Sequence, residues 1–171
     1  MKPTLPVHLN FRQKAKNGFE IQGKWPLNQL KRLDEVLQSD AGEVDVSLKF
    51  GKIGPIPFIE GHITAEVQLL CQRCMQPMAY TVDNPFKLGM VLNEEQIERL
   101  PDEFEPYLVD DEDSYIGELL EDELLLALPL VAMHDYECSD YLQEQEPAHE
   151  TEVKDSEQKE NPFAALKDLL K

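Results

Sequence analysis

The sequence predicts an α+β fold in which two main helices pack on an antiparallel, hairpin-rich sheet or partly closed barrel. Several segments alternate apolar and polar residues with a period of two, and two segments carry leucines at helical spacing. A length of 171 residues with 42% hydrophobic residues suits one domain with loose ends. We predict a single domain over 1–138, a disordered acidic linker over 139–160 and an amphipathic helix over 161–171.

The first elements are predicted to be short and extended. Leu5, Val7, Leu9 and Phe11 recur at every second position, and a strand is predicted around residues 19–21. A helix is predicted over 26–38, because Pro26 suits a first helical position and four leucines then recur every three or four residues. Those leucines are Leu27, Leu30, Leu33 and Leu37.

The centre of the chain is predicted to be a set of antiparallel strands. Residues 44–50 and 62–69 alternate strictly, and residues 78–90 form a return strand. The sequence Cys71-Gln72-Arg73-Cys74 separates the last two segments. We therefore expect a hairpin that carries both cysteines at its tip.

The second half begins with an acidic region, in which a short helix near Ile97 and an extended piece over 104–109 are predicted. A second main helix is predicted over 114–128, and Pro129 should end it. Residues 139–160 are too polar to form a core. The segment 161–171 has the apolar face of a short helix, which docks either on its own domain or on a partner.

The formal charge of −18 is unevenly distributed along the chain. Residues 1–92 carry a net charge of +2, residues 93–123 carry −13 and residues 124–171 carry −7. Only the first half can therefore approach a phosphate backbone, whereas the middle suits a basic protein. The alternative is that the acidity only maintains solubility.

Several functional classes lack support in this sequence. No apolar stretch approaches the ~20 residues of a membrane span, and the first residues lack signal-peptide features, so we expect a cytoplasmic protein. The sequence contains no glycine-rich phosphate loop, nucleophile motif or nuclease-like carboxylate pair. We expect neither an enzyme nor a protein with a small-molecule substrate.

The cysteines define the candidate site. Cys71 and Cys74 can hold one metal ion, and His134 and Cys138 can complete a tetrahedral zinc site, because thiolate and imidazole ligands suit zinc. Such a site would join the hairpin tip to the segment after the second helix. The alternatives are reduced structural cysteines with an exposed His134, or a redox pair, which more often begins a helix.

Four segments occur in a specific order and at a specific overall length. They are VQLL followed by CQRC, then PDEFEPYLVDDED, EDELLLALPLVAMHD and NPFAALKDLLK. In these the chain resembles the large ribosomal RNA subunit accumulation protein YceD family. The resemblance implies a bacterial cytoplasmic protein needed for synthesis, processing or stability of large-subunit (23S) ribosomal RNA, and it implies no catalytic reaction. Some members carry a second cysteine pair downstream, where this chain has only Cys138 and His134.

Three functional hypotheses follow. The first is a ribosome-assembly factor whose acidic 94–123 surface holds a basic ribosomal protein, and it is the one favoured by the net charge. In the second, basic side chains of the first half and the hairpin contact precursor rRNA directly. The third is a zinc- or thiol-dependent RNA-processing or redox enzyme that uses Cys71 and Cys74. The candidate RNA-contacting residues are Arg12, Lys14, Lys16, Lys24, Lys31, Arg32 and Arg73.

Overall fold

The computed structural model describes residues 4–109 and 113–139. All of these except Ser139 fall in one compact unit, Met1–Cys138, whose architecture follows. The acidic linker predicted beyond Ser139 and the helix predicted over 161–171 lie outside the described residues.

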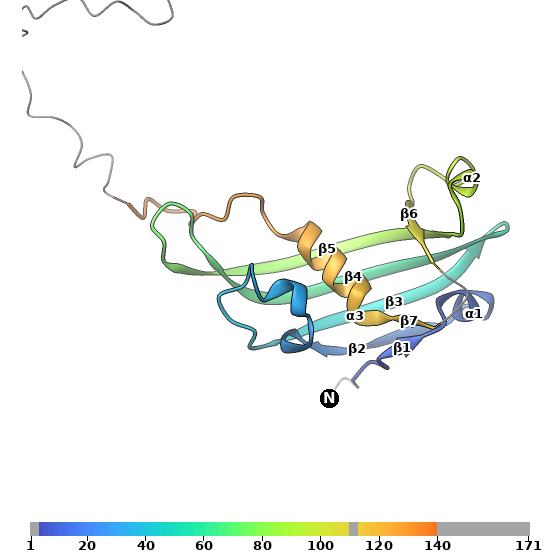
Figure 1. Ribbon diagram of the computed structural model, residues 1–171, viewed down its shortest axis with the longest axis horizontal. Helices are drawn as coiled ribbons and strands as arrows, with labels where there is room; N and C mark the ends of the chain where they lie inside the picture. Colours follow the sequence, from blue (N-terminus) through green and yellow to red (C-terminus); the bar gives the residue numbers. More distant parts are fainter. Residues whose placement is uncertain (1–3, 110–112, 140–171) are drawn as a thin grey trace, which may run out of the picture. The chain divides into compact units, whose positions relative to one another are not determined.

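One five-stranded sheet dominates this unit (Figure 1). Its strands are β2 (Glu20–Pro26), β3 (Glu43–Ile53), β4 (Ile56–Leu70), β5 (Pro77–Val91) and β6 (Glu105–Leu108). They lie in the order β2-β3-β4-β5-β6, and neighbours are antiparallel except that β6 runs parallel to β5. The predicted α+β class is confirmed, and the sheet stays open instead of closing into a barrel.

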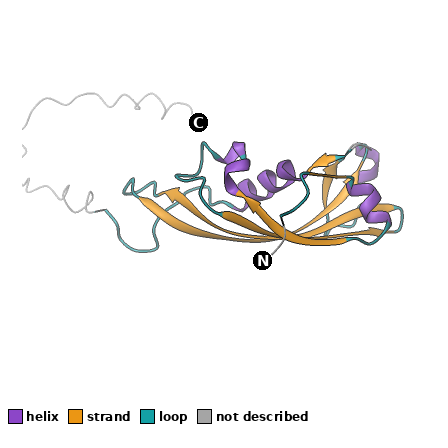
Figure 2. Ribbon diagram, turned by 90° about the horizontal axis from the view of Figure 1, so that it is seen from below, coloured by secondary structure: helices purple, strands orange, loops and turns teal. Residues whose placement is uncertain are grey.

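The remaining elements are short apart from one helix. They are β1 (His8–Leu9), α1 (Phe11–Lys16), the 3₁₀ turns η1 (Leu27–Gln29) and η2 (Lys31–Leu33), α2 (Glu94–Ile97), β7 (Ser114–Tyr115) and α3 (Ile116–Ala127). Strand β1 pairs with β7 as a second, two-stranded sheet. The helices lie on one face of the curved sheet, and the core fills the space between them (Figure 2). Of the helices in the described ranges, none has the length and apolar content that a membrane span requires.

The predicted central strands are confirmed. Alternate residues of β3, such as Val44, Val46 and Leu48, are buried, while their neighbours reach the other face. Strands β4 and β5 form the predicted hairpin, in which Leu70 pairs with Pro77 across the loop that carries Cys71 and Cys74. The register of these strands therefore follows from the period-two pattern, because one face is buried against the helices.

The helix predicted over 26–38 is wrong. The segment forms two separate 3₁₀ turns, η1 and η2, divided by Leu30 at φ −99° and ψ 81°. Leu27, Leu30 and Leu33 are spaced by three, and residues three apart lie above one another in a 3₁₀ turn. All three are at most 1% exposed. The leucines are therefore core residues as predicted, but the backbone that buries them is not α-helical.

The extended segment predicted over residues 5–11 is only partly correct. A two-residue strand, β1, is followed at once by α1, which sequence reasoning missed. The side chain of Asn10 caps this helix by accepting a hydrogen bond of 2.8 Å from the backbone N–H of Gln13. Phe11 starts the helix and packs its ring 5.6 Å from that of Phe50. The helix predicted over 114–128 is confirmed as α3, but it begins only at Ile116, because Ser114 and Tyr115 pair with β1 as strand β7. It ends two residues before Pro129.

Candidate metal centre

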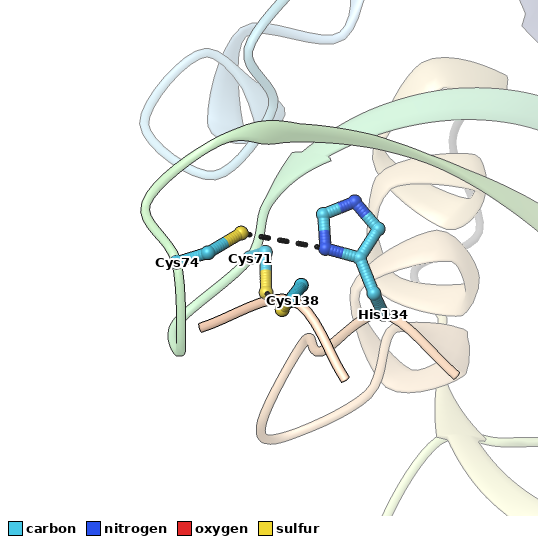
Figure 3. Close-up of side chains that lie close together, drawn as sticks. All are labelled: Cys71, Cys74, His134 and Cys138. Carbon is cyan, nitrogen blue, oxygen red and sulfur yellow. Dashed lines mark hydrogen bonds between the residues drawn. The ribbon is translucent and has the colours of Figure 1, made fainter. Parts of the chain in front are cut away.

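The loop between β4 and β5 positions the first two candidate ligands. The backbone N–H of Cys71 donates to the carbonyl of Gln76, and the N–H of Met75 donates to the carbonyl of Cys71, both at 2.9 Å. Met75 takes the left-handed conformation, with φ 55°. The chain therefore turns tightly enough to direct the thiols of Cys71 and Cys74 to the same side (Figure 3).

The segment after α3 brings the other two candidate ligands to this loop. The backbone N–H of Gln72 donates to the carbonyl of Ala132 at 2.8 Å, which fastens the two segments together. Ala132 is buried at 6% exposure beneath them. His134 and Cys138 follow and reach the hairpin tip from about 60 residues downstream, at 3.5 Å between Cys74 Sγ and His134 Nδ1.

The four candidate ligand atoms form a compact group. The sulfur atoms of Cys71, Cys74 and Cys138 and a ring nitrogen of His134 all lie within 4.8 Å of one another. Cys71 Sγ lies 3.7 Å from Cys138 Sγ, and Cys74 Sγ lies 3.5 Å from His134 Nδ1. A tetrahedral zinc ion with bonds of about 2.3 Å to sulfur and about 2.0 Å to nitrogen places such pairs about 3.8 Å and about 3.5 Å apart. The residues present therefore fit a tetrahedral ion.

Arg73 lies between the two hairpin cysteines and holds the downstream segment. Its Nε donates to Cys138 Sγ at 3.1 Å, and its Nη2 donates to the carbonyl oxygens of His134, at 3.1 Å, and Tyr136. Three thiolates and a divalent cation leave one net negative charge, which this guanidinium can balance. Sequence reasoning missed this role, because an arginine inside CxxC looks like an exposed cation.

The protonation of the thiols depends on their surroundings. Burial raises the pKa of Cys71, but the backbone N–H groups of Cys74, His134 and Arg73 outweigh it and lower this pKa to about 5. Burial also raises the pKa of Cys74, and its contacts with Cys138 and Cys71 add to the rise. Metal ligands must be deprotonated, so a cation is the group that allows several thiolates to share this space.

The seven candidate RNA-contacting side chains are not gathered into one patch. They lie on α1, β2, η2 and the hairpin tip, and most contact other side chains. Lys24 pairs with Glu43 at 2.8 Å, Lys31 pairs with Asp34 at 3.8 Å and Arg32 pairs with Asp122. Lys14 lies 4.2 Å above the ring of Phe19.

The fold and this cluster define a small α+β protein with a candidate structural metal centre between a hairpin tip and a loop. The chain belongs to the YceD family, because residues 59–170 match the family described as "Large ribosomal RNA subunit accumulation protein YceD". A curated relative of that name from Haemophilus influenzae is 33% identical over 175 residues, which cover 98% of this chain and 97% of the relative. No solved structure matches the chain.

Proposed function

We propose that this chain is a non-enzymatic factor that supports the accumulation of large-subunit ribosomal RNA by binding a basic protein of the large-subunit precursor. The name of the curated relative, which the chain matches over nearly its whole length, supports the link to this RNA. The distribution of charge supports a protein as the direct partner. That distribution is the observation that carries the proposal.

Many acidic side chains of the described residues 94–109 and 113–123 are exposed, on and around α2, β6 and the start of α3, whereas Glu121 and Glu123 are buried. Glu94, Glu95 and Glu98 are exposed at α2, and Glu103 and Glu105 follow before and within β6. A surface of this sign attracts a basic partner and repels phosphate. Lys24, Lys31 and Arg32 already form ion pairs with acidic side chains. Because ion-paired cations are less available to RNA, these pairs also support a protein as the direct partner.

The test compares capture by two full-length variants of equal charge change. In the first, Glu94, Glu95, Glu98, Asp102, Glu103 and Glu105 become lysine. In the second, six acidic residues from the first half, Glu20, Asp34, Glu35, Asp40, Glu43 and Asp45, become lysine. We expect a tagged wild-type chain to retain a basic large-subunit protein after RNase, and only the first variant to lose it.

Two outcomes would contradict the protein-binding route. Capture that is unchanged in the first variant means that the acidic surface is not the contact. Recovery of precursor RNA, with all proteins lost after RNase, moves the contact to the basic side chains of the first half. Circular dichroism of both variants establishes that each retains the wild-type fold.

We also propose that Cys71, Cys74, His134 and Cys138 hold one zinc ion as a structural centre. The separations of 3.7 Å between Cys71 Sγ and Cys138 Sγ and of 3.5 Å between Cys74 Sγ and His134 Nδ1 fit a tetrahedron and support zinc, as does the position of Arg73. Bound zinc would fix the segment after α3 to the hairpin tip and supply no reaction. Chain purified without chelators should contain close to one zinc per molecule, and C71S/C74S should contain almost none. Zinc far below one per wild-type chain contradicts the proposal.

A further inference from the structure

Strand β5 has a long open edge. It spans 15 residues and pairs with β4 from Pro77 to Gly89, but on its other side β6 pairs only with Leu88–Val91. Within the described ranges, no other strand lies against the outer side of residues 77–87. An edge of this kind presents unpaired N–H and C=O groups, which can pair with an added chain. Pro77 and Pro85, which have no N–H, limit the usable ladder to the residues between them.

A groove adjoins the Asn84 end of this edge, where Glu60 and Gly61 of β4 also line it. It has a volume of about 630 Å³ and lies between β5, the start of β6 and the C-terminal half of α3. Asn84, Phe86, Glu105 and Glu123 line it together with Leu126, whose side chain is 73% exposed. A second groove of about 290 Å³ shares Glu105, Glu123 and Leu126, and Leu88 and Leu125 make it more apolar. An added strand therefore finds an apolar contact beside the open ladder.

The charge of the groove selects the sign of its occupant. Four carboxylates line the larger groove, those of Glu60, Glu103, Glu105 and Glu123, and Lys87 is the one cation among its lining residues. Lys87 is already held by Glu103 at 2.7 Å and by Glu60 at 3.8 Å. Lysine or arginine side chains on an added strand would complement the remaining negative charge.

We propose that the β5 edge from Met78 to Asn84, with the adjoining groove, docks an extended basic segment of a partner protein by strand addition. The segment pairs its backbone with β5, places an apolar side chain against Leu126 and directs basic side chains toward Glu103 and Glu105. This inference rests on the proposed function for the basic character of the partner. It adds the docking strand, the binding mode and the conformation of the bound segment.

The first experiment measures amide hydrogen exchange of the full chain with a defined probe. The probe is an 11-residue capped peptide of alternating lysine and valine, and binding is followed by fluorescence anisotropy. We expect the amides of residues 78–84 that point away from β4 to gain protection, because the alternate amides already pair with β4. A peptide with glutamate in place of lysine, and one with N-methyl groups on alternate residues, should each bind at least about tenfold more weakly, a difference of about 1.4 kcal/mol.

Matched variants locate the contact. Leu126→Arg and Glu105→Lys should each weaken peptide binding about tenfold. Leu130→Arg and Glu20→Lys are the controls, because Leu130 is 99% exposed outside the groove and Glu20 lies on the opposite edge strand. All four positions are exposed, so the fold should persist, which circular dichroism checks. Equal losses in the control variants would reject the groove as the contact.

The outcomes separate this inference from the proposed function. If the wild type and L126R/E105K capture basic ribosomal proteins equally well, the groove is not the docking site, while the proposed function is retained. If the peptide protects β5 but no ribosomal protein is captured, strand addition at the β5 edge is supported and the proposed function is wrong. If the amides of residues 78–84 that point away from β4 are already protected in the free chain at high dilution, another part of the chain covers the edge and the inference is wrong.

Discussion

Met75 is the residue at which the hairpin tip stores backbone strain. Its φ of 55° lies in the left-handed region, which costs an L-residue about 1–2 kcal/mol. The N–H of Met75 donates to the carbonyl of Cys71, so the strained conformation is part of the turn that presents Cys74. The side chain itself is 61% exposed and contributes little packing.

Met75→Gly should therefore stabilise the protein. Glycine adopts this φ without strain, and its greater freedom in the unfolded chain offsets part of the gain, which leaves about 0.5–1 kcal/mol. That corresponds to a rise in Tm of about 1–4 °C for a chain of this size. Ala79→Gly, at an exposed position in β5, is the matched control and should lower Tm. An equal fall in Tm for both variants would show that the turn is not strained.

The four candidate ligands were all identifiable from residue type, but their convergence was not. Cys71 and Cys74 are linked by spacing, whereas His134 and Cys138 are more than 60 positions away from Cys71. The two segments are joined by a hydrogen bond from the backbone N–H of Gln72 to the carbonyl of Ala132. A bond between backbone atoms cannot be predicted from the types of the two residues. For the same reason Arg73 was predicted as a candidate RNA contact, while the structure shows it turned toward Cys138.

At the scale of elements, α3 is fixed to the η2 turn by two neighbouring carboxylates in different ways. Glu121 is 7% exposed, and its carboxylate accepts a hydrogen bond of 3.0 Å from the backbone N–H of Arg32. Asp122 pairs with the guanidinium of the same residue at the surface. A buried bond to the backbone contributes more than an exposed ion pair, which water and salt screen.

Glu121→Ala should lower the free energy of unfolding by about 1–3 kcal/mol, because it leaves the N–H of Arg32 without this acceptor. Asp122→Ala should cause a smaller loss, and Glu121→Gln, which keeps an oxygen acceptor, should retain most of the stability. Urea unfolding followed by circular dichroism measures all three. If the loss for Asp122→Ala equals that for Glu121→Ala, the exposed ion pair holds α3 as strongly as the backbone bond.

Glu123 makes the packing of α3 on the sheet sensitive to pH. Its side chain is only 5% exposed, and this burial is the main cause that raises the pKa of its carboxyl to about 7. The nearby charge of Glu105 on β6 is the second cause. Asn84 Nδ2 on β5 donates a hydrogen bond to the carboxylate and opposes the rise. Asp122 adds a smaller rise. The folded chain therefore binds this proton more tightly than the unfolded chain, and Glu123 destabilises the fold progressively as pH rises from about 4.5 to 7.

Glu123→Gln should remove this effect. At pH 8 the variant should have a free energy of unfolding about 1–3 kcal/mol above that of the wild type, whereas at pH 4 the two should agree. Glu118→Gln, an exposed change on the same helix, is the control and should have little effect at either pH. A difference between Glu123→Gln and wild type that is the same at both pH values would contradict the assignment.

Elements with a clear period were predictable, and those formed by tertiary packing were not. The alternation in β3 and β4 predicted strands because one face of each is buried. The leucines of residues 27–37 fit an α-helix and successive 3₁₀ turns equally well, and packing against the core decided between them. The parallel pairing of β6 with β5 was also invisible, since it depends on how residues 92–104 cross back over the sheet.

For the whole unit, the sheet and the candidate metal centre depend on different interactions. The largest fully buried side chains, among them Trp25, Phe50 and Ile63, lie between the sheet and its helices. Within the described part of the chain, the segment after α3 is attached to the hairpin tip mainly through Ala132, Arg73 and the four candidate ligands. Loss of an ion should therefore release this segment without unfolding the sheet.

Treatment with a zinc chelator should consequently increase amide exchange at residues 71–76 and 132–138 by at least about tenfold, a difference of about 1.4 kcal/mol in local opening. Exchange in the middle of β3 and β4 should stay unchanged, because the hydrophobic core retains all its contacts. C71S/C74S should show the same pattern without chelator. Unfolding of the whole sheet on chelation would mean that the ion maintains the entire fold, and an unchanged hairpin tip would mean that the four side chains hold no ion.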